Sequence, residues 1–136
     1  MTSMIKKLVL LTLCMCTLSS LGASAQEQVA PGVWLSRNGN FRLSTTDIES
    51  STPNEWTLYI RTSERAPVSD ATIEVHAFHS ATSKILPRTP IISAHMGRGQ
   101  YDVYNLYFDE PGQWDINVVV SSGSTVDAIL LPVQIP

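Results

Sequence analysis

Cysteine is nearly absent from this chain of 136 residues: only Cys14 and Cys16 occur, both within the first 25 residues. Residues 26–136 therefore cannot form a disulfide, use a thiol in catalysis, or bind zinc or an iron–sulfur cluster through cysteine. Basic side chains are also scarce, because 9 Lys and Arg face 12 Asp and Glu, for a net charge of −3. A chain without a basic excess lacks the charge that holds nucleic acid, so we expect no nucleic-acid partner.

Catalytic motifs are missing as well. The sequence contains no Gly-x-Ser-x-Gly segment and no recognisable arrangement of Ser, His and an acidic residue. Gly97-Arg98-Gly99 has neither the lysine nor the following helix of a phosphate-binding loop, and we interpret it as a turn before a strand. We therefore expect that the protein is not an enzyme. The length, with 43% apolar residues, suits one domain with its own core rather than two.

The first 25 residues have the pattern of a cleavable signal peptide. Met1–Lys7 carries two lysines, residues 8–21 are apolar, and Ala23-Ser24-Ala25 suits signal peptidase, with cleavage expected before Gln26. The apolar run is too short for a transmembrane anchor, so we expect no membrane span after cleavage. The remaining domain, residues 26–136, has a net charge of −5, and we expect it in the periplasm or secreted.

Residues 26–136 show the two-residue alternation of β-strands that bury one face. The alternation of apolar and polar side chains is clear at residues 56–61, 72–77 and 114–118. About seven such strands joined by turns, with no helix of useful length, predict an all-β antiparallel sandwich of two sheets. The predicted core consists of Trp56, Leu58, Ile60, Ile73, Val75, Tyr101, Val103, Leu106, Phe108, Trp114, Ile116, Val118 and Leu130.

Two turn motifs predict hairpins. Asn38-Gly39, between strands at Val33–Arg37 and Phe41–Thr45, favours a type I′ turn because both residues tolerate positive φ. Glu110-Pro111-Gly112 places Pro and Gly where a type II turn requires them, and we expect a second hairpin there. Ser121–Ser124 then turns the chain into a last strand at about residues 126–133.

Two segments interrupt the regular pattern. The apolar alternation changes phase near Tyr104-Asn105, and one extra residue there would restore it, which predicts a β-bulge. Residues 79–96 contain Pro87 and Pro90, which exclude a central strand or a helix, and we expect this stretch to be irregular.

The order and spacing of several motifs resemble the YtkA-like domain, which is related to FixH-type domains. The resemblance covers about residues 36–135 and rests on Pro67-Val68-x-Asp70-Ala71-x-Ile73-x-Val75, Gly97-x-Gly99-x-Tyr101-x-Val103, Leu106-x-Phe108 and Pro111-Gly112-x-Trp114. It implies an exported immunoglobulin-like sandwich, often near copper or haem-oxidase functions and without an established enzyme activity. Arg65 stands where this family usually has a glycine.

The histidine and methionine side chains of residues 26–136 lie in one region of the sequence. His76, His79, His95 and Met96 are its only histidines and its only methionine, and they lie within 21 positions. Imidazoles with a thioether suit copper. The family commonly has Met-Pro followed by closely spaced histidines, whereas residues 76–82 here read His-Ala-Phe-His-Ser-Ala-Thr. Two histidines three residues apart on one strand also point to opposite faces.

Two functions follow from these residues, and a third hypothesis is an enzyme of unknown class, which predicts a concave pocket with at least two converging polar groups of perturbed pKa. The first is a non-enzymatic binding module that meets another periplasmic or cell-envelope protein through loops or an exposed sheet edge. On that interpretation His76 lies on the solvent face beside Glu74, and His79, His95 and Met96 decorate a surface loop. The alternative is a periplasmic copper-handling protein that binds copper through these four residues. The non-enzymatic binding module requires no cofactor. Trp34 and Tyr104 are the aromatic residues expected to be exposed.

Overall fold

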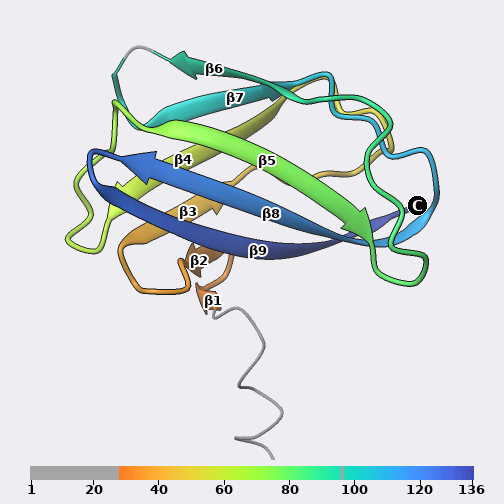
Figure 1. The fold of residues 1–136 in the computed structure, drawn as a ribbon, viewed down its shortest axis with the longest axis horizontal. Helices are drawn as coiled ribbons and strands as arrows, with labels where there is room; N and C mark the ends of the chain where they lie inside the picture. The colour runs from red at the N-terminus through yellow and green to blue at the C-terminus, as the bar shows by residue number, and fades with distance from the viewer. Residues whose placement is uncertain (1–27, 96) are drawn as a thin grey trace, which may run out of the picture.

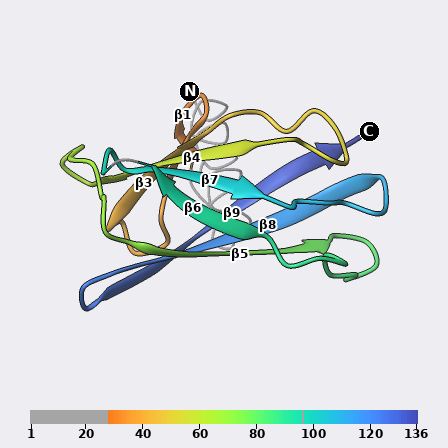
Figure 2. The same ribbon diagram turned by 90° about the horizontal axis from the view of Figure 1, so that it is seen from above.

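The computed structural model describes residues 28–95 and 97–136, without the side chain of His95. The predicted signal peptide at residues 1–25 and Met96 lie outside the described residues. Two antiparallel sheets face each other and enclose the core (Figures 1 and 2). In the described part of the chain, no helix has the length and apolar character needed to cross a membrane.

The first sheet has six strands in the order β1-β2-β3-β4-β7-β6, and the second has three in the order β5-β8-β9. The pairing of β3-β4-β7-β6 against β5-β8-β9 is the four-plus-three arrangement of constant-type immunoglobulin domains. The predicted immunoglobulin-like sandwich is therefore confirmed, with nine strands in the described residues rather than about seven. They are β1 (Gln28–Ala30), β2 (Val33–Leu35), β3 (Phe41–Thr45), β4 (Trp56–Thr62), β5 (Thr72–His79), β6 (Ile91–His95), β7 (Gln100–Tyr104), β8 (Gly112–Ser122) and β9 (Thr125–Ile135).

The core lies between the two sheets and follows the predicted alternation. Every predicted core residue except Leu130 is buried, and the largest fully buried side chains are those of Trp56 and Trp114. Leu130 is partly exposed, and its two neighbours, Ile129 and Leu131, face inward instead. The prediction for Leu130 was wrong because the apolar run at 128–131 has no alternation that would reveal which residues face the core.

The β2–β3 hairpin forms, but its turn is not of type I′. Gly39 has φ +79° while Asn38 has no positive φ, and a type I′ turn requires both. The Ser36 N–H donates to the Phe41 carbonyl at 2.9 Å, which closes a longer loop over residues 37–40. This loop is wider because its backbone amides turn toward a carboxylate from the opposite sheet.

That carboxylate belongs to Asp127 on β9, a buried residue that holds the two sheets together at this end. It accepts hydrogen bonds from Ser36 Oγ at 2.6 Å, from the Asn38 N–H at 3.1 Å and from Asn40 Nδ2 at 3.1 Å. Burial alone would raise the pKa of Asp127, but these bonds and those from the backbone N–H groups of Ala128, Asn38 and Asn40 outweigh it and lower the pKa. The ionised carboxylate therefore stabilises the fold.

The connection from β7 to β8 corrects two turn predictions. Strand β7 ends at Tyr104, and Asn105, at φ +62°, turns the chain out of the first sheet. The change of apolar phase thus marks the end of a strand and not a bulge, and Leu106 and Phe108 are buried in the crossing segment. Gly112 has the predicted positive φ, +117°, but its turn begins β8 in the other sheet and forms no hairpin.

The stretch from residue 79 to residue 96 is less irregular than predicted. Residues Ile91–His95 form β6, which pairs with β7 at the edge of the first sheet. Pro87 and Pro90 precede the strand and do not interrupt it. Proline excludes central strands, and β6 avoids the exclusion because it is an edge strand that begins after Pro90.

The hydrogen bonds of Asp127 predict a pH-dependent contribution to stability. Asp127→Asn should lower the free energy of unfolding by about 1–3 kcal/mol at pH 7, since it leaves buried donors poorly satisfied. Because the pKa of Asp127 is lowered on folding, the stabilisation is present above the ordinary carboxyl pKa and is lost as the pH falls through the folded-state value. Urea unfolding at pH 7 and at about pH 3 should therefore show a difference from wild type that shrinks in acid. A difference independent of pH would contradict this role.

Candidate functional site

The predicted site residues on β5 lie on opposite faces of the strand. His76 is exposed, and its Nε2 lies 3.5 Å from Glu74 Oε1, which is exposed as well. The expectation that His76 sits on the solvent face beside Glu74 is confirmed. His79, three residues further on, is buried with only 6% of its surface exposed. The two imidazoles therefore do not approach each other, as the two-residue period of the strand requires.

His79 is a structural residue at the end of β5, and the prediction that it lies on a surface loop was wrong. Its Nε2 lies 2.9 Å from the Pro111 carbonyl oxygen, and the Ala81 N–H donates to its Nδ1 at 3.2 Å. A neutral imidazole protonated on Nε2 satisfies both bonds. The ring also packs at 86° against Trp114, with 5.3 Å between ring centroids. Both nitrogens are thus engaged, and a metal would have to displace a hydrogen bond to bind either one.

Gly112 is part of the same arrangement. A Cβ atom at this position would lie 2.7 Å from His79 Nε2, closer than any non-bonded contact allows. The glycine therefore serves both the positive φ of the turn and the close approach of the imidazole to the Pro111 carbonyl.

Of the other two predicted copper ligands, one lies in the first sheet and the other lies outside the described residues. The backbone of His95 pairs with Gln100 at the end of β6, and Met96 lies outside the described residues. The part of the chain that the structure describes contains no group of three His, Cys, Asp or Glu side chains that could hold a metal ion. The copper hypothesis gains no support from these residues.

The contrast between the two histidines of β5 can be tested by stability. His79→Ala should lower the free energy of unfolding by about 2 kcal/mol or more, because it removes a buried aromatic side chain with its contact to Trp114 and two part-buried hydrogen bonds. His76→Ala, at an exposed position, should change it by less than about 0.5 kcal/mol. Urea denaturation of the two variants measures both values, and equal effects would contradict the structural role of His79.

Strand β5 has a free edge. It pairs with β8 on one side only, and on the other side just its last residues are covered, through the isolated bridge between Phe78 and Ile85 (Figure 1). The His79 N–H points away from β8, toward the Lys84 carbonyl at 2.8 Å. Because alternate residues of a strand share this direction, the N–H and C=O groups of Ile73 and Val75 point away from β8 too. Within the described residues, neither has a backbone partner on that side.

A groove of about 250 Å³ runs beside this edge. Its apolar side chains include those of Leu86 and of Ile85, which is 72% exposed, while the buried residues Val75 and Ala77 line it from β5. Arg88 supplies the positive charge, and its guanidinium carbon lies 4.7 Å from the centroid of the Tyr107 ring. We call this site the β5 edge groove; it is lined by Val75, His76, Ala77, Ile85, Leu86, Arg88, Thr89 and Pro90.

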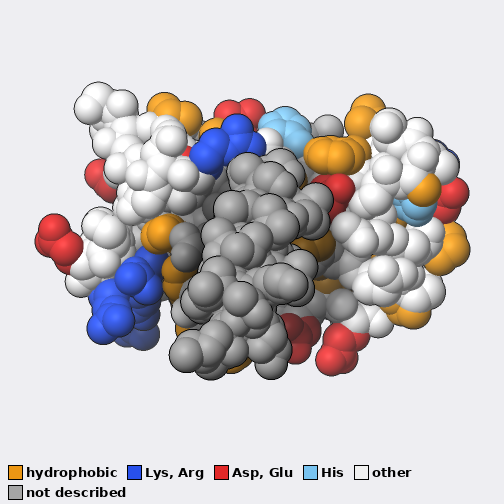
Figure 3. Space-filling view, turned by 90° about the horizontal axis from the view of Figure 1, so that it is seen from below, with side chains coloured by type: hydrophobic (Ala, Val, Ile, Leu, Met, Phe, Trp, Pro, Cys, Tyr) orange, Lys and Arg blue, Asp and Glu red, His pale blue; other side chains and the backbone are white. Residues whose placement is uncertain are grey.

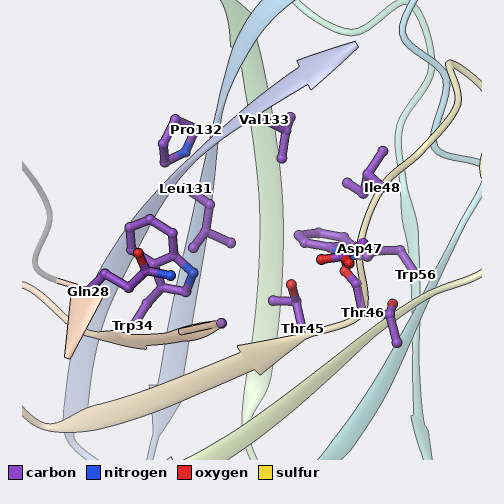
Figure 4. A pocket seen from close by; sticks show the side chains of 11 residues that line it. Gln28, Trp34, Thr45, Thr46, Asp47, Ile48, Trp56, Leu131, Pro132 and Val133 are labelled. Atoms are coloured by element: carbon purple, nitrogen blue, oxygen red, sulfur yellow. The ribbon is translucent and has the colours of Figure 1, made fainter. Parts of the chain in front are cut away.

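A second, smaller cleft of about 200 Å³ opens between β2, β3 and β9 (Figure 4). Trp34 and Leu131 line one side of it, and Trp56 lies on the other beside Asp47 and Ile48. Trp56 is buried and donates its indole N–H to the Thr46 carbonyl at 2.9 Å, and Trp34 is half-buried against the core. The expected exposure of Trp34 is therefore only partial, whereas Tyr104 is 38% exposed as predicted.

Sequence reasoning did not locate the β5 edge groove. Its signal was the apolar pair Ile85-Leu86 in an otherwise polar, proline-containing stretch, which a solvated loop does not need. The groove also depends on β5 being an edge strand, and strand order is a property of the fold.

The fold is an immunoglobulin-like sandwich in which β5 is an edge strand of the three-stranded sheet. The YtkA-like family model matches residues 35–119. The chain therefore belongs to the YtkA-like family, which confirms the resemblance noted from its motifs. No curated protein and no solved structure shows a significant match to the chain.

Proposed function

We propose that this protein is an exported, non-enzymatic binding module that takes up an extended segment of another cell-envelope protein at the β5 edge groove. The signal-peptide pattern of residues 1–25 supports export to the periplasm or beyond the cell. The observation that carries the binding role is the unpaired edge of β5 beside an apolar, partly cationic groove.

An open strand edge recognises a polypeptide through its backbone. An added strand would pair with the outward N–H and C=O groups of Ile73 and Val75, which gives affinity without regard to sequence. Proteins usually cover such edges or protect them with lysine, proline or a bulge. Between Ile73 and Ala77, β5 has no lysine, proline or bulge, and its one acidic or basic side chain apart from His76 is that of Glu74.

The groove supplies the specificity. Ile85 and Leu86 offer contact to an apolar side chain of the added strand, because alternate side chains of a strand point to the same side. Arg88 forms no ion pair with any described residue and is exposed next to them. The segment that fits best is extended and carries an apolar residue followed by an acidic one.

The test uses peptides as the probe. Peptides that bind the purified protein are first selected from a random 12-residue display library. Their affinity for the variants Ile85→Glu and Arg88→Glu should be at least ten-fold weaker than for wild type. Both side chains are exposed, so the fold should be unaffected. Fluorescence polarisation with a labelled synthetic peptide measures the affinities.

Two matched controls carry the same changes elsewhere. Val126→Glu alters an apolar side chain that is 60% exposed on β9, and Arg98→Glu reverses an exposed arginine, and both should bind as wild type does. N-methylation of alternate backbone positions of the peptide should abolish binding in one register and spare it in the other. Failure to enrich any peptide, or equal loss with the control variants, would contradict the proposal.

A further inference from the structure

Three arginines gather on the outer face of the first sheet, far from the groove in the fold. Arg42 of β3 and Arg61 of β4 stand directly opposite each other in the strand register, and Arg65 follows in the loop after β4. Like charges directly opposite each other destabilise a sheet. In Figure 3, which views the molecule from below, Lys and Arg side chains cluster at the lower left, beside hydrophobic ones.

The three side chains line one pocket of about 390 Å³, a size suited to a small-molecule ligand. Ser44 adds a hydroxyl group, and Ala30 and Val33 add an apolar wall. Among the ion pairs between described residues, none includes an arginine of this pocket. Glu64, the neighbour of Arg65 in sequence, is not among the lining residues. The pocket therefore holds positive charge that no described carboxylate neutralises.

Two further observations indicate that the cluster serves a ligand. The Nε atom of Arg42 is buried and has no hydrogen-bond partner among the described residues, and such an atom is costly to leave unpaired. Arg65 has φ +72°, a conformation that is strained for a residue with a side chain and that glycine adopts freely. A guanidinium thus stands at a position where glycine would be less strained.

The loop holds Arg65 in place. Its N–H donates to the Thr62 carbonyl at 2.9 Å, and the Ala66 N–H donates to Thr62 Oγ1 at 3.1 Å. The Arg65 carbonyl in turn accepts a bond from Arg61 Nη1 at 3.4 Å. The backbone therefore fixes the loop that carries Arg65 and holds the Arg61 guanidinium before any ligand arrives, which lowers the entropy lost on binding.

We propose that this arginine pocket binds a phosphate group attached to an apolar body. Guanidinium groups bind oxyanions through paired N–H donors, and a carboxylate has too few oxygens to engage three such groups, whereas a phosphate offers three. The Ser44 hydroxyl donates a further bond, and the wall of Ala30 and Val33 suits the organic part of the molecule. The ligand is thus a phosphate monoester, either free or as the headgroup of phosphatidic acid.

The binding experiment distinguishes these sources and the role of each arginine. Calorimetric titration of the purified protein with glycerol 3-phosphate tests the free ester. Flotation with phosphatidylcholine vesicles that contain phosphatidic acid, against vesicles of phosphatidylcholine alone, tests the headgroup. Whichever of the two experiments detects binding, Arg42→Gln, Arg61→Gln and Arg65→Gln should each weaken that binding at least ten-fold. Arg98→Gln removes an exposed arginine elsewhere and should have no effect.

Arg65→Gly separates ligand binding from folding. The variant introduces the residue that suits positive φ, so its urea midpoint should equal or exceed that of wild type, while its phosphate binding should fall at least ten-fold. Absence of binding in both arms would overturn the proposal. Equal binding of acetate, or equal weakening by Arg98→Gln, would overturn it as well, because either result indicates attraction of any anion by any surface charge.

Discussion

The burial of Trp114 between the two sheets is the interaction on which the rest of the structure depends. Residues 26–136 contain no cysteine, so no disulfide joins the sheets, and packing has to do so. The Trp114 side chain is fully buried, its indole N–H donates to the Glu110 carbonyl at 2.9 Å, and its ring meets Phe108 at 5.3 Å. His79 packs on the same indole from β5. One residue of β8 thus fixes the crossing segment, the turn at Gly112 and the end of β5.

The position of the open edge follows from that packing. His79 and Phe78 anchor the end of β5, and the loop after them folds back only far enough to bridge Phe78 to Ile85. The strand from Ile73 to Ala77 therefore stays unpaired on one side, with the apolar loop residues beside it. His79, one of the copper ligands considered from the sequence, thus holds the end of the open strand in place. The arginine pocket lies on the other sheet, so the two surfaces are separate.

The alternation of apolar residues was enough to predict the sandwich and most of its core. It predicted burial at Trp56, Val75 and Trp114, because a strand with one face in solvent alternates apolar and polar residues. The alternation did not reveal that Leu130 faces outward, because its neighbours on both sides are apolar as well. It also did not distinguish the strand end at Asn105 from a bulge, because both change the phase of the apolar residues. His79 was misplaced because its partners, Pro111 and Trp114, lie more than 30 residues away in sequence. The turn at Asn38-Gly39 likewise depends on Asp127, which local turn preferences do not include.

The central claim is that β5 presents a free backbone edge. Amide hydrogen exchange of the purified protein, resolved by residue with NMR, tests it most directly. The account predicts fast exchange at Ile73 and Val75, whose N–H groups point away from β8, and slow exchange at Glu74 and His76, whose N–H groups point toward it. Equal and strong protection of all four amides would contradict the account, because the edge would then already be paired.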